Sequence, residues 1–152
     1  MQIKTILVPY DFSDYAAHAL TWAAELAKRY QAKLLLFHAV PVFSRAGYPG
    51  GMFLLDLSKI EAEAIADAEK RLQEVVAAAG LTVSVEIKTV IGDAVWEICQ
   101  AVEREHVDLV IMGSHGRTGL AHIVLGSVAE RVVRHASCPV LVARKPQEGE
   151  KH

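Results

Sequence analysis

The sequence lacks the features of several protein classes. It has no apolar run long enough to span a bilayer, and its first apolar stretch stops at Pro9 and Asp11. That stretch is also too short for the core of a secretory signal, so we expect a cytoplasmic protein with no membrane segment. Only two cysteines occur, Cys99 and Cys138, and their spacing indicates no metal knuckle. We expect both to be buried thiols.

The chain also lacks a charge excess of either sign. Sixteen Lys and Arg against 18 Asp and Glu give a net charge of −2, so no basic field is available for DNA or RNA. Apolar residues make up 52% of the 152 residues and charged residues 22%, which is typical of a globular chain. This length suits a single domain, which we place at residues 1–144, followed by a polar tail at 145–152.

What the sequence contains is a regular alternation of strands and helices. Short apolar runs predict strands, and apolar residues at helical spacing predict helices. The expected strands are 3–9, 33–40, 81–91, 107–112 and 139–143. The expected helices follow N-caps at Ser13 and Asp93, run from about Leu55 to Ala79, and begin at Ser127 in a capping box with Glu130. Five strands alternating with four helices predict a parallel sheet with helices on both faces.

The third strand indicates the strand order. Residues 81–91 alternate between apolar and polar, with Glu86 and Lys88 on the polar side, which is typical of an edge strand. We therefore predict a doubly wound, Rossmann-like sheet of order 3-2-1-4-5 rather than 2-1-3-4-5. The chain then reverses direction between strands 1 and 4, where ligands bind in such folds. The loops at that switch point are 9–13 and 113–117.

The loop after the fourth strand carries a glycine pattern. Gly113, Gly116 and Gly126-Ser127 are separated by two and nine residues. Glycine allows a positive φ and lets backbone approach a ligand closely, and the helix starting at Ser127 offers amides and a dipole that favour phosphate. The alternative is that the glycines only form a tight turn and Ser127 only caps its helix. The whole pattern at a switch point favours binding.

This segment resembles the nucleotide-binding members of the universal stress protein family, whose motif is G-x2-G-x9-G-[S/T]. The opening ILVPYDFSDYA and the closing ASCPVLVAR are also similar to that family, so the resemblance covers about residues 2–144. It implies an adenine nucleotide alpha hydrolase-like fold that binds ATP, or ADP or AMP, with Mg²⁺ bridging the phosphates. The residues implied to contact the nucleotide are Pro9, Tyr10, Asp11, Val40, Met112, Gly113, His115, Gly116, Arg117, Gly126, Ser127 and Val128.

The resemblance also implies roles for these residues. Pro9, Tyr10 and Asp11 would line the nucleoside wall, Val40 would meet adenine through its backbone, and Gly113 would approach the ribose. The phosphates would lie at Gly116, Gly126, Ser127 and Val128, with added contacts from His115 and Arg117. For Asp11 the alternative is a carboxylate that only forms a turn with Ser13, and Arg117 is otherwise solvated.

Several catalytic patterns are missing. The chain has no Walker A motif, no lysine within 113–126, and no carboxylate pair or Ser/His/Asp arrangement at recognisable spacing. We therefore predict no catalytic residues and a nucleotide that acts as a switch or sensor in stress response or signalling. A slow ATPase or nucleotidyl transferase is the enzymatic alternative, and a ligand-free dimeric scaffold is the third. The seven histidines are scattered, and we predict no protein metal site.

The last strand indicates a partner. Residues 139–143 are apolar, lie at the sheet edge in the predicted order, and lack the charges that usually protect an edge. We expect a two-fold homodimer, which the family resemblance also implies. The strand that would form it comprises Pro139, Val140, Leu141, Val142 and Ala143. The loop 41–52 is either a lid over the nucleotide, through Arg45, Tyr48, Met52 and the following Phe53, or a variable surface loop, which we favour.

Overall fold

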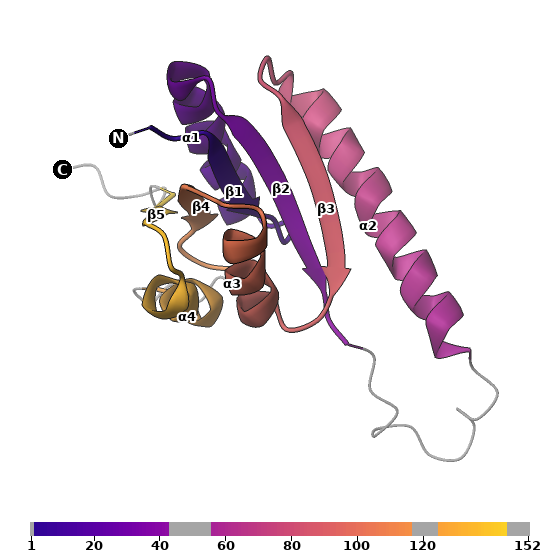
Figure 1. The fold of residues 1–152 in the computed structure, drawn as a ribbon. Coiled ribbons are helices and arrows are strands. Elements are labelled where there is room, and N and C mark those ends of the chain that lie inside the picture. The colour runs from indigo at the N-terminus through magenta and orange to yellow at the C-terminus, as the bar shows by residue number, and fades with distance from the viewer. Residues whose placement is uncertain (1, 43–55, 117–124, 146–152) are drawn as a thin grey trace.

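The chain forms one five-stranded parallel sheet with helices on both sides (Figure 1). The computed structural model describes residues 2–42, 56–116 and 125–145. The elements in chain order are β1 (Thr5–Pro9), α1 (Asp14–Tyr30), β2 (Lys33–Val40), α2 (Leu57–Ala79), β3 (Val85–Ile91), α3 (Ala94–Arg104), β4 (Leu109–Gly113), α4 (Ser127–His135) and β5 (Val140–Ala143). The strand order is β3-β2-β1-β4-β5, so the predicted fold class and order are confirmed.

Two apolar layers sandwich the sheet. Successive strand residues point to opposite faces, so Ile6 packs into the layer under α1 and α2, while Leu7 packs into the layer under α3 and α4. Both side chains are fully buried. Figure 1 shows α2 lying against β3, with α3 and α4 on the other side of the sheet. This double covering explains why the central residues of β1, β2 and β4 are apolar and buried.

The edge strand β3 behaves as its sequence predicts. Its ladder with β2 starts at Val85, so residues 81–84 precede the strand that was expected to include them. Glu86 is exposed and forms an ion pair of 2.7 Å with Lys33 on β2. Lys88 pairs with Glu105, the residue that follows α3. Polar side chains are tolerated here because an edge strand leaves one flank open to water.

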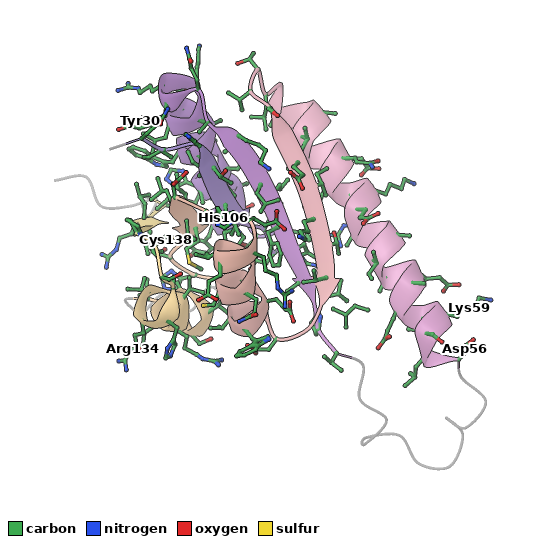
Figure 2. All side chains as sticks on the ribbon, in the orientation of Figure 1. Tyr30, Asp56, Lys59, His106, Arg134 and Cys138 are labelled. Carbon is green, nitrogen blue, oxygen red and sulfur yellow. The ribbon has the colours of Figure 1, made fainter. Side chains whose placement is uncertain are left out.

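The starts of α1 and α3 confirm the two predicted N-caps. Ser13 Oγ accepts the Ala16 amide at 3.1 Å, and Asp93 accepts the Trp96 amide at 3.0 Å. Helix α2 begins after Asp56, whose carboxylate accepts the amides of Ser58 and Lys59 in the first turn; Asp56 and Lys59 are labelled in Figure 2.

The predicted capping box at Ser127 is wrong. The N-cap of α4 is Gly126, in extended conformation, and none of the described side chains caps this helix. Because the Gly126 carbonyl accepts the first intrahelical bond, from Glu130 at 2.9 Å, Ser127 is already the first helical residue. Its hydroxyl is therefore one position too late to act as the cap.

The cysteines also differ from expectation. Both thiols are only half-buried, because Cys99 lies at the margin of the α3 face and Cys138 in the turn before β5. Partial burial still raises the pKa of the Cys99 thiol and of the Cys138 thiol. None of the helices within the described ranges is both long and apolar enough to cross a membrane.

Candidate functional site

A cavity lies at the carboxyl ends of β1 and β4, the neighbouring strands at which the chain changes direction. Its volume is about 460 Å³, within the range of small-molecule sites. The residues that line it come from the ends of β1, β2 and β4, from the loops that follow β1 and β4, and from α1, α3 and α4. They are Pro9, Tyr10, Asp11, Ala16, Phe37, His38, Ala39, Ala94, Ile98, Met112, Gly113, His115, Gly116, Gly126, Ser127, Val128 and Ala129.

The turn after β1 shapes one wall. Asp11 Oδ1 accepts the Ser13 amide at 3.0 Å and the Ser13 hydroxyl at 2.5 Å, while Ser13 also caps α1. The turn with Ser13 that the alternative interpretation of Asp11 required is therefore present. The same residue lines the cavity, so its structural role and a ligand contact do not exclude each other.

Gly116 and Gly126, after β4, lie so close to neighbouring segments that a side chain would not fit. Among the described glycines only Gly80 has a positive φ, so the positive-φ argument does not apply to Gly113, Gly116 or Gly126. A Cβ at Gly116 would lie 2.9 Å from Asp11 Oδ2. A Cβ at Gly126 would lie 3.2 Å from both the His115 Cα and the Ser114 carbonyl oxygen. These two glycines let the loop after β4, the β1 turn and the start of α4 converge on one point.

Gly113 serves packing. A Cβ there would lie 2.8 Å from backbone atoms of Tyr15, so this glycine allows α1 to pack against the end of β4. Gly113 also lines the cavity, so its backbone could still make the contact with a ribose that the family resemblance implies. The contact with Tyr15 alone is sufficient reason for a glycine at this position.

The loop after β4 is tied down by hydrogen bonds of its own. The Gly126 amide donates to the Ser114 carbonyl at 2.7 Å, and the Ser114 amide donates to the Ala143 carbonyl at 3.2 Å. Gly126 thus contributes space to the cavity, because its donor is already used. The amides of Ser127, Val128 and Ala129 precede the first intrahelical bond of α4, and all three residues line the cavity.

The electrostatics of the cavity depend on backbone dipoles. None of the described lining residues is lysine or arginine, and Asp11 adds a negative charge. Burial, and then the nearby Asp11 carboxylate, raise the pKa of Tyr10, so its phenol stays neutral. In the described part of the chain no three His, Cys, Asp or Glu side chains form a group that could hold a metal ion. The N-terminus of α4 is the feature that favours an anion.

The other end of the cavity is apolar, and little in the sequence pattern indicated it. Phe37 and Ala39 come from the end of β2, and Ala94 and Ile98 from one face of α3. The spacing of four between Ala94 and Ile98 was the available signal, because both project from the same side of a helix. The lining residues that the sequence did not predict are Ala16, Phe37, His38, Ala39, Ala94, Ile98 and Ala129.

One predicted residue, Val40, does not join this set. Val40 is absent from the cavity wall, and its carbonyl accepts the Gly92 amide at 2.9 Å, which extends the β2–β3 ladder by one bond. Arg117 lies outside the described residues, as do the lid candidates Arg45, Tyr48, Met52 and Phe53. The other predicted site residues line the cavity together.

The chain is similar in sequence to proteins of a known family. A sequence model described as the universal stress protein family matches residues 2–144. Universal stress protein MJ0531 of Methanocaldococcus jannaschii is 34% identical over 145 residues, covering 95% of this chain and 84% of that protein.

Solved structures share the fold. The structure of protein MJ0577 superposes with a TM-score of 0.82 at 29% identity, covering 97% of this chain and all (100%) of that one. A universal stress protein from Archaeoglobus fulgidus was solved in complex with dAMP. Its fold matches with a TM-score of 0.63 at 23% identity, over 93% of this chain and 98% of that one.

Proposed function

The chain belongs to the universal stress protein family, and we propose that its cavity binds an adenine nucleotide, ATP or a related one. The proposal rests on one observation: the N-terminus of α4 and the closely packed Asp11 and Gly116 line the same cavity at the sheet's switch point. The dAMP complex of a family member with the same fold supports the nucleotide class.

The phosphates would lie at the start of α4. The Ser127, Val128 and Ala129 amides have no acceptor within their own helix, so an anion in the cavity would accept from them. Gly116 would bring a further stretch of backbone to the same place, since its missing Cβ leaves that room next to Asp11. This arrangement needs no lysine, unlike a Walker A loop.

The base would lie in the apolar end. Phe37, Ala39, Ala94 and Ile98 form a surface that removes a flat ring from water, and burial of apolar area favours such a ring. Ala39 is the residue at the end of β2 that would face the base, in place of Val40, whose carbonyl is used by Gly92.

Mg²⁺ would be held through the nucleotide. The donor set fits a cation carried by phosphate oxygens, since the described residues hold no metal-binding group of their own and Asp11 is the one carboxylate in the lining. A bound cation would offset the repulsion between Asp11 and the phosphates. The chain's own residues would orient the triphosphate and exclude water from its inner side.

The nucleotide would act as a switch in a homodimer formed through β5. The Ser114 amide donates to Ala143 on β5, so the phosphate loop and the edge strand share a hydrogen bond. Val140, Leu141 and Val142 are only partly buried within one chain, which leaves apolar surface for a second copy. A nucleotide that orders the loop would then also change the conformation of the β5 edge at the dimer interface.

The test is nucleotide binding by purified protein, measured by isothermal titration calorimetry with Mg·ATP and by mass spectrometry of gently purified material. We expect one nucleotide per chain at micromolar affinity, about −8 kcal/mol. Gly126→Val places a branched side chain against Ser114 and His115 and should abolish binding. Val133→Ala, an exposed position on α4, is the control and should bind normally. Equal binding by the Gly126→Val protein would refute this site.

A further inference from the structure

Phe12 occupies a backbone conformation that aromatic residues rarely adopt. Its φ is +65°, in the left-handed region. There the Cβ crowds the following carbonyl oxygen, so the conformation costs free energy that other contacts must offset. Glycine would adopt the same φ without this strain. The ring of Phe12 must therefore contribute contacts that glycine could not make.

The ring contacts three other side chains, which we call together with it the Phe12 cluster. The guanidinium carbon of Arg71, on α2, lies 3.8 Å from the ring centroid. The Tyr10 ring meets it edge-on, with centroids 5.5 Å apart and planes at 88°. The His38 ring, on β2, lies 5.0 Å away at 62°. The cluster thus joins the β1 turn to α2 and β2.

Arg71 covers the outer side of this cluster. The residue is exposed, whereas Phe12 is half-buried and packs against the core layer under α1 and α2. A guanidinium over an aromatic face is attracted by the ring quadrupole, and its stem shields the ring from water. Arg71 therefore stabilises the ring in the orientation that the left-handed backbone requires.

The backbone of Phe12 sets the position of Asp11. Phe12 is the middle residue of the turn in which Asp11 Oδ1 accepts both the amide and the hydroxyl of Ser13. The second oxygen of Asp11 lies where Gly116 has no side chain. Two members of the cluster, Tyr10 and His38, also line the cavity, and His38 Nδ1 donates to the Tyr10 carbonyl at 2.7 Å. Any rotation at Phe12 would move this wall.

We propose that Phe12 and Arg71 are positioning residues for the nucleotide site: Arg71 holds the Phe12 ring, and the ring holds the strained turn that aims Asp11 at Gly116. This inference rests on the proposed nucleotide function. Neither residue contacts the nucleotide. Their effect is to prepare the wall before binding, which lowers the ordering that a ligand would otherwise have to impose.

Two variants test the two links separately. Phe12→Gly keeps the left-handed backbone accessible but removes the ring, and should weaken Mg·ATP binding about tenfold, because the turn is no longer held in one conformation. Arg71→Met keeps the stem and removes the charge, and should weaken binding about two- to fivefold. Arg71→Lys returns a cation over the ring and should recover most of this loss.

Matched controls separate positioning from general destabilisation. Val76→Ala removes packing from the same core layer on α2 and should lower the melting temperature without changing affinity. Lys70→Met, an exposed neighbour of Arg71, should change neither. All affinities are measured well below each variant's melting temperature, so that only folded protein is compared.

A second readout does not require the nucleotide. In ¹H–¹⁵N spectra of ligand-free protein, the Ser13 and Gly116 amides should shift or broaden in Phe12→Gly and Arg71→Met, and stay in place in Val76→Ala and Lys70→Met. If wild-type protein binds no nucleotide, the proposed function fails and these spectra alone decide the role of Phe12. Unchanged Ser13 and Gly116 signals, or wild-type affinity in both cluster variants, would overturn the proposal. If Phe12→Gly fails to fold, the Arg71→Met and Arg71→Lys pair still decides it.

Discussion

The carboxylate of Asp11 and the backbone of Gly116 lie so close that a methyl group on Gly116 would sit 2.9 Å from Asp11 Oδ2. The two residues are far apart in sequence and come from the two central loops of the sheet's switch point. Their contact joins the β1 turn to the loop after β4, and it places a negative charge beside the helix terminus that would receive phosphate. The proposed site is built around this contact.

The Asp11–Gly116 contact predicts the effect of Gly116→Ala. The new methyl group must displace a carboxylate held by two hydrogen bonds from Ser13, and hydrogen bonds to a charged group are worth about 1.5 to 3 kcal/mol each. We expect nucleotide affinity to fall about tenfold or more, measured by calorimetry.

The control for this variant is Gly80→Ala. Gly80 ends α2 in left-handed conformation, with open space around its Cβ position. Alanine there should cost about 1 kcal/mol of stability and leave affinity unchanged. The account of Gly116 is wrong if its alanine variant lowers only the melting temperature, as Gly80→Ala does.

Gly113→Ala is expected to affect stability first. Its methyl group would lie 2.8 Å from backbone atoms of Tyr15, and backbone cannot move aside as a side chain can. Overpacking of this kind costs about 1 to 3 kcal/mol, which lowers the melting temperature by roughly 3 to 10 °C in a chain of this size. Calorimetric melting measures it. Gly92→Ala should cost clearly less, because the atoms nearest to its methyl group belong to the Glu97 side chain, which can move aside. Equal losses in the two variants would contradict the packing role of Gly113.

Much of this arrangement could be read from the sequence, for identifiable reasons. The alternation of apolar and polar residues over 81–91, with Glu86 and Lys88 on the polar side, indicated an edge strand. That edge set the strand order and hence the switch point. The spacing of Gly113, Gly116 and Gly126 indicated a loop at that point, and all three line the cavity. These features depend on local pattern, which one sequence displays directly.

Other features depend on contacts between distant segments. Nothing near Phe12 in the sequence signals a left-handed φ, because the ring contacts that accompany it come from Arg71 and His38 on other elements. The use of the Gly126 amide by Ser114 likewise depends on how the loop closes. The apolar end of the cavity was missed because Phe37 and Ile98 are what any core strand and helix contain.

Divalent cations should matter more for ATP than for AMP. ATP brings several negative charges to a cavity whose described lining contains Asp11 and no lysine or arginine. We expect chelation of Mg²⁺ to weaken ATP binding about tenfold and AMP binding less than twofold, by titration with and without EDTA. ATP affinity that does not depend on Mg²⁺ would contradict the metal's role. If the Arg117→Gln protein then lost this Mg²⁺-independent ATP binding, the positive charge that offsets the phosphates would come from Arg117.

The β5 edge should control self-association. The Pro139 carbonyl accepts the Val110 amide of β4 at 3.0 Å, and the Ala143 carbonyl accepts the amide of Ser114, the residue after β4, at 3.2 Å. Because successive residues of a strand turn their N–H and C=O groups to opposite sides, those of Val140 and Val142 face the open edge. Val142→Pro removes an outward N–H without touching the β4 ladder, and should weaken a dimer at least about tenfold in analytical ultracentrifugation. Val133→Lys, on the exposed side of α4, is the control. A dimer that survives Val142→Pro does not use this edge.

The most direct test of the nucleotide site is a ¹H–¹⁵N NMR titration of the wild-type protein with Mg·ATP. We expect saturable shifts, largest for the amides of Gly116, Ser127 and Val128, and a small shift for Gly126, whose N–H already donates to Ser114. Saturable shifts centred on any other surface, or no shifts at about 1 mM nucleotide, would show that the nucleotide does not bind at this site.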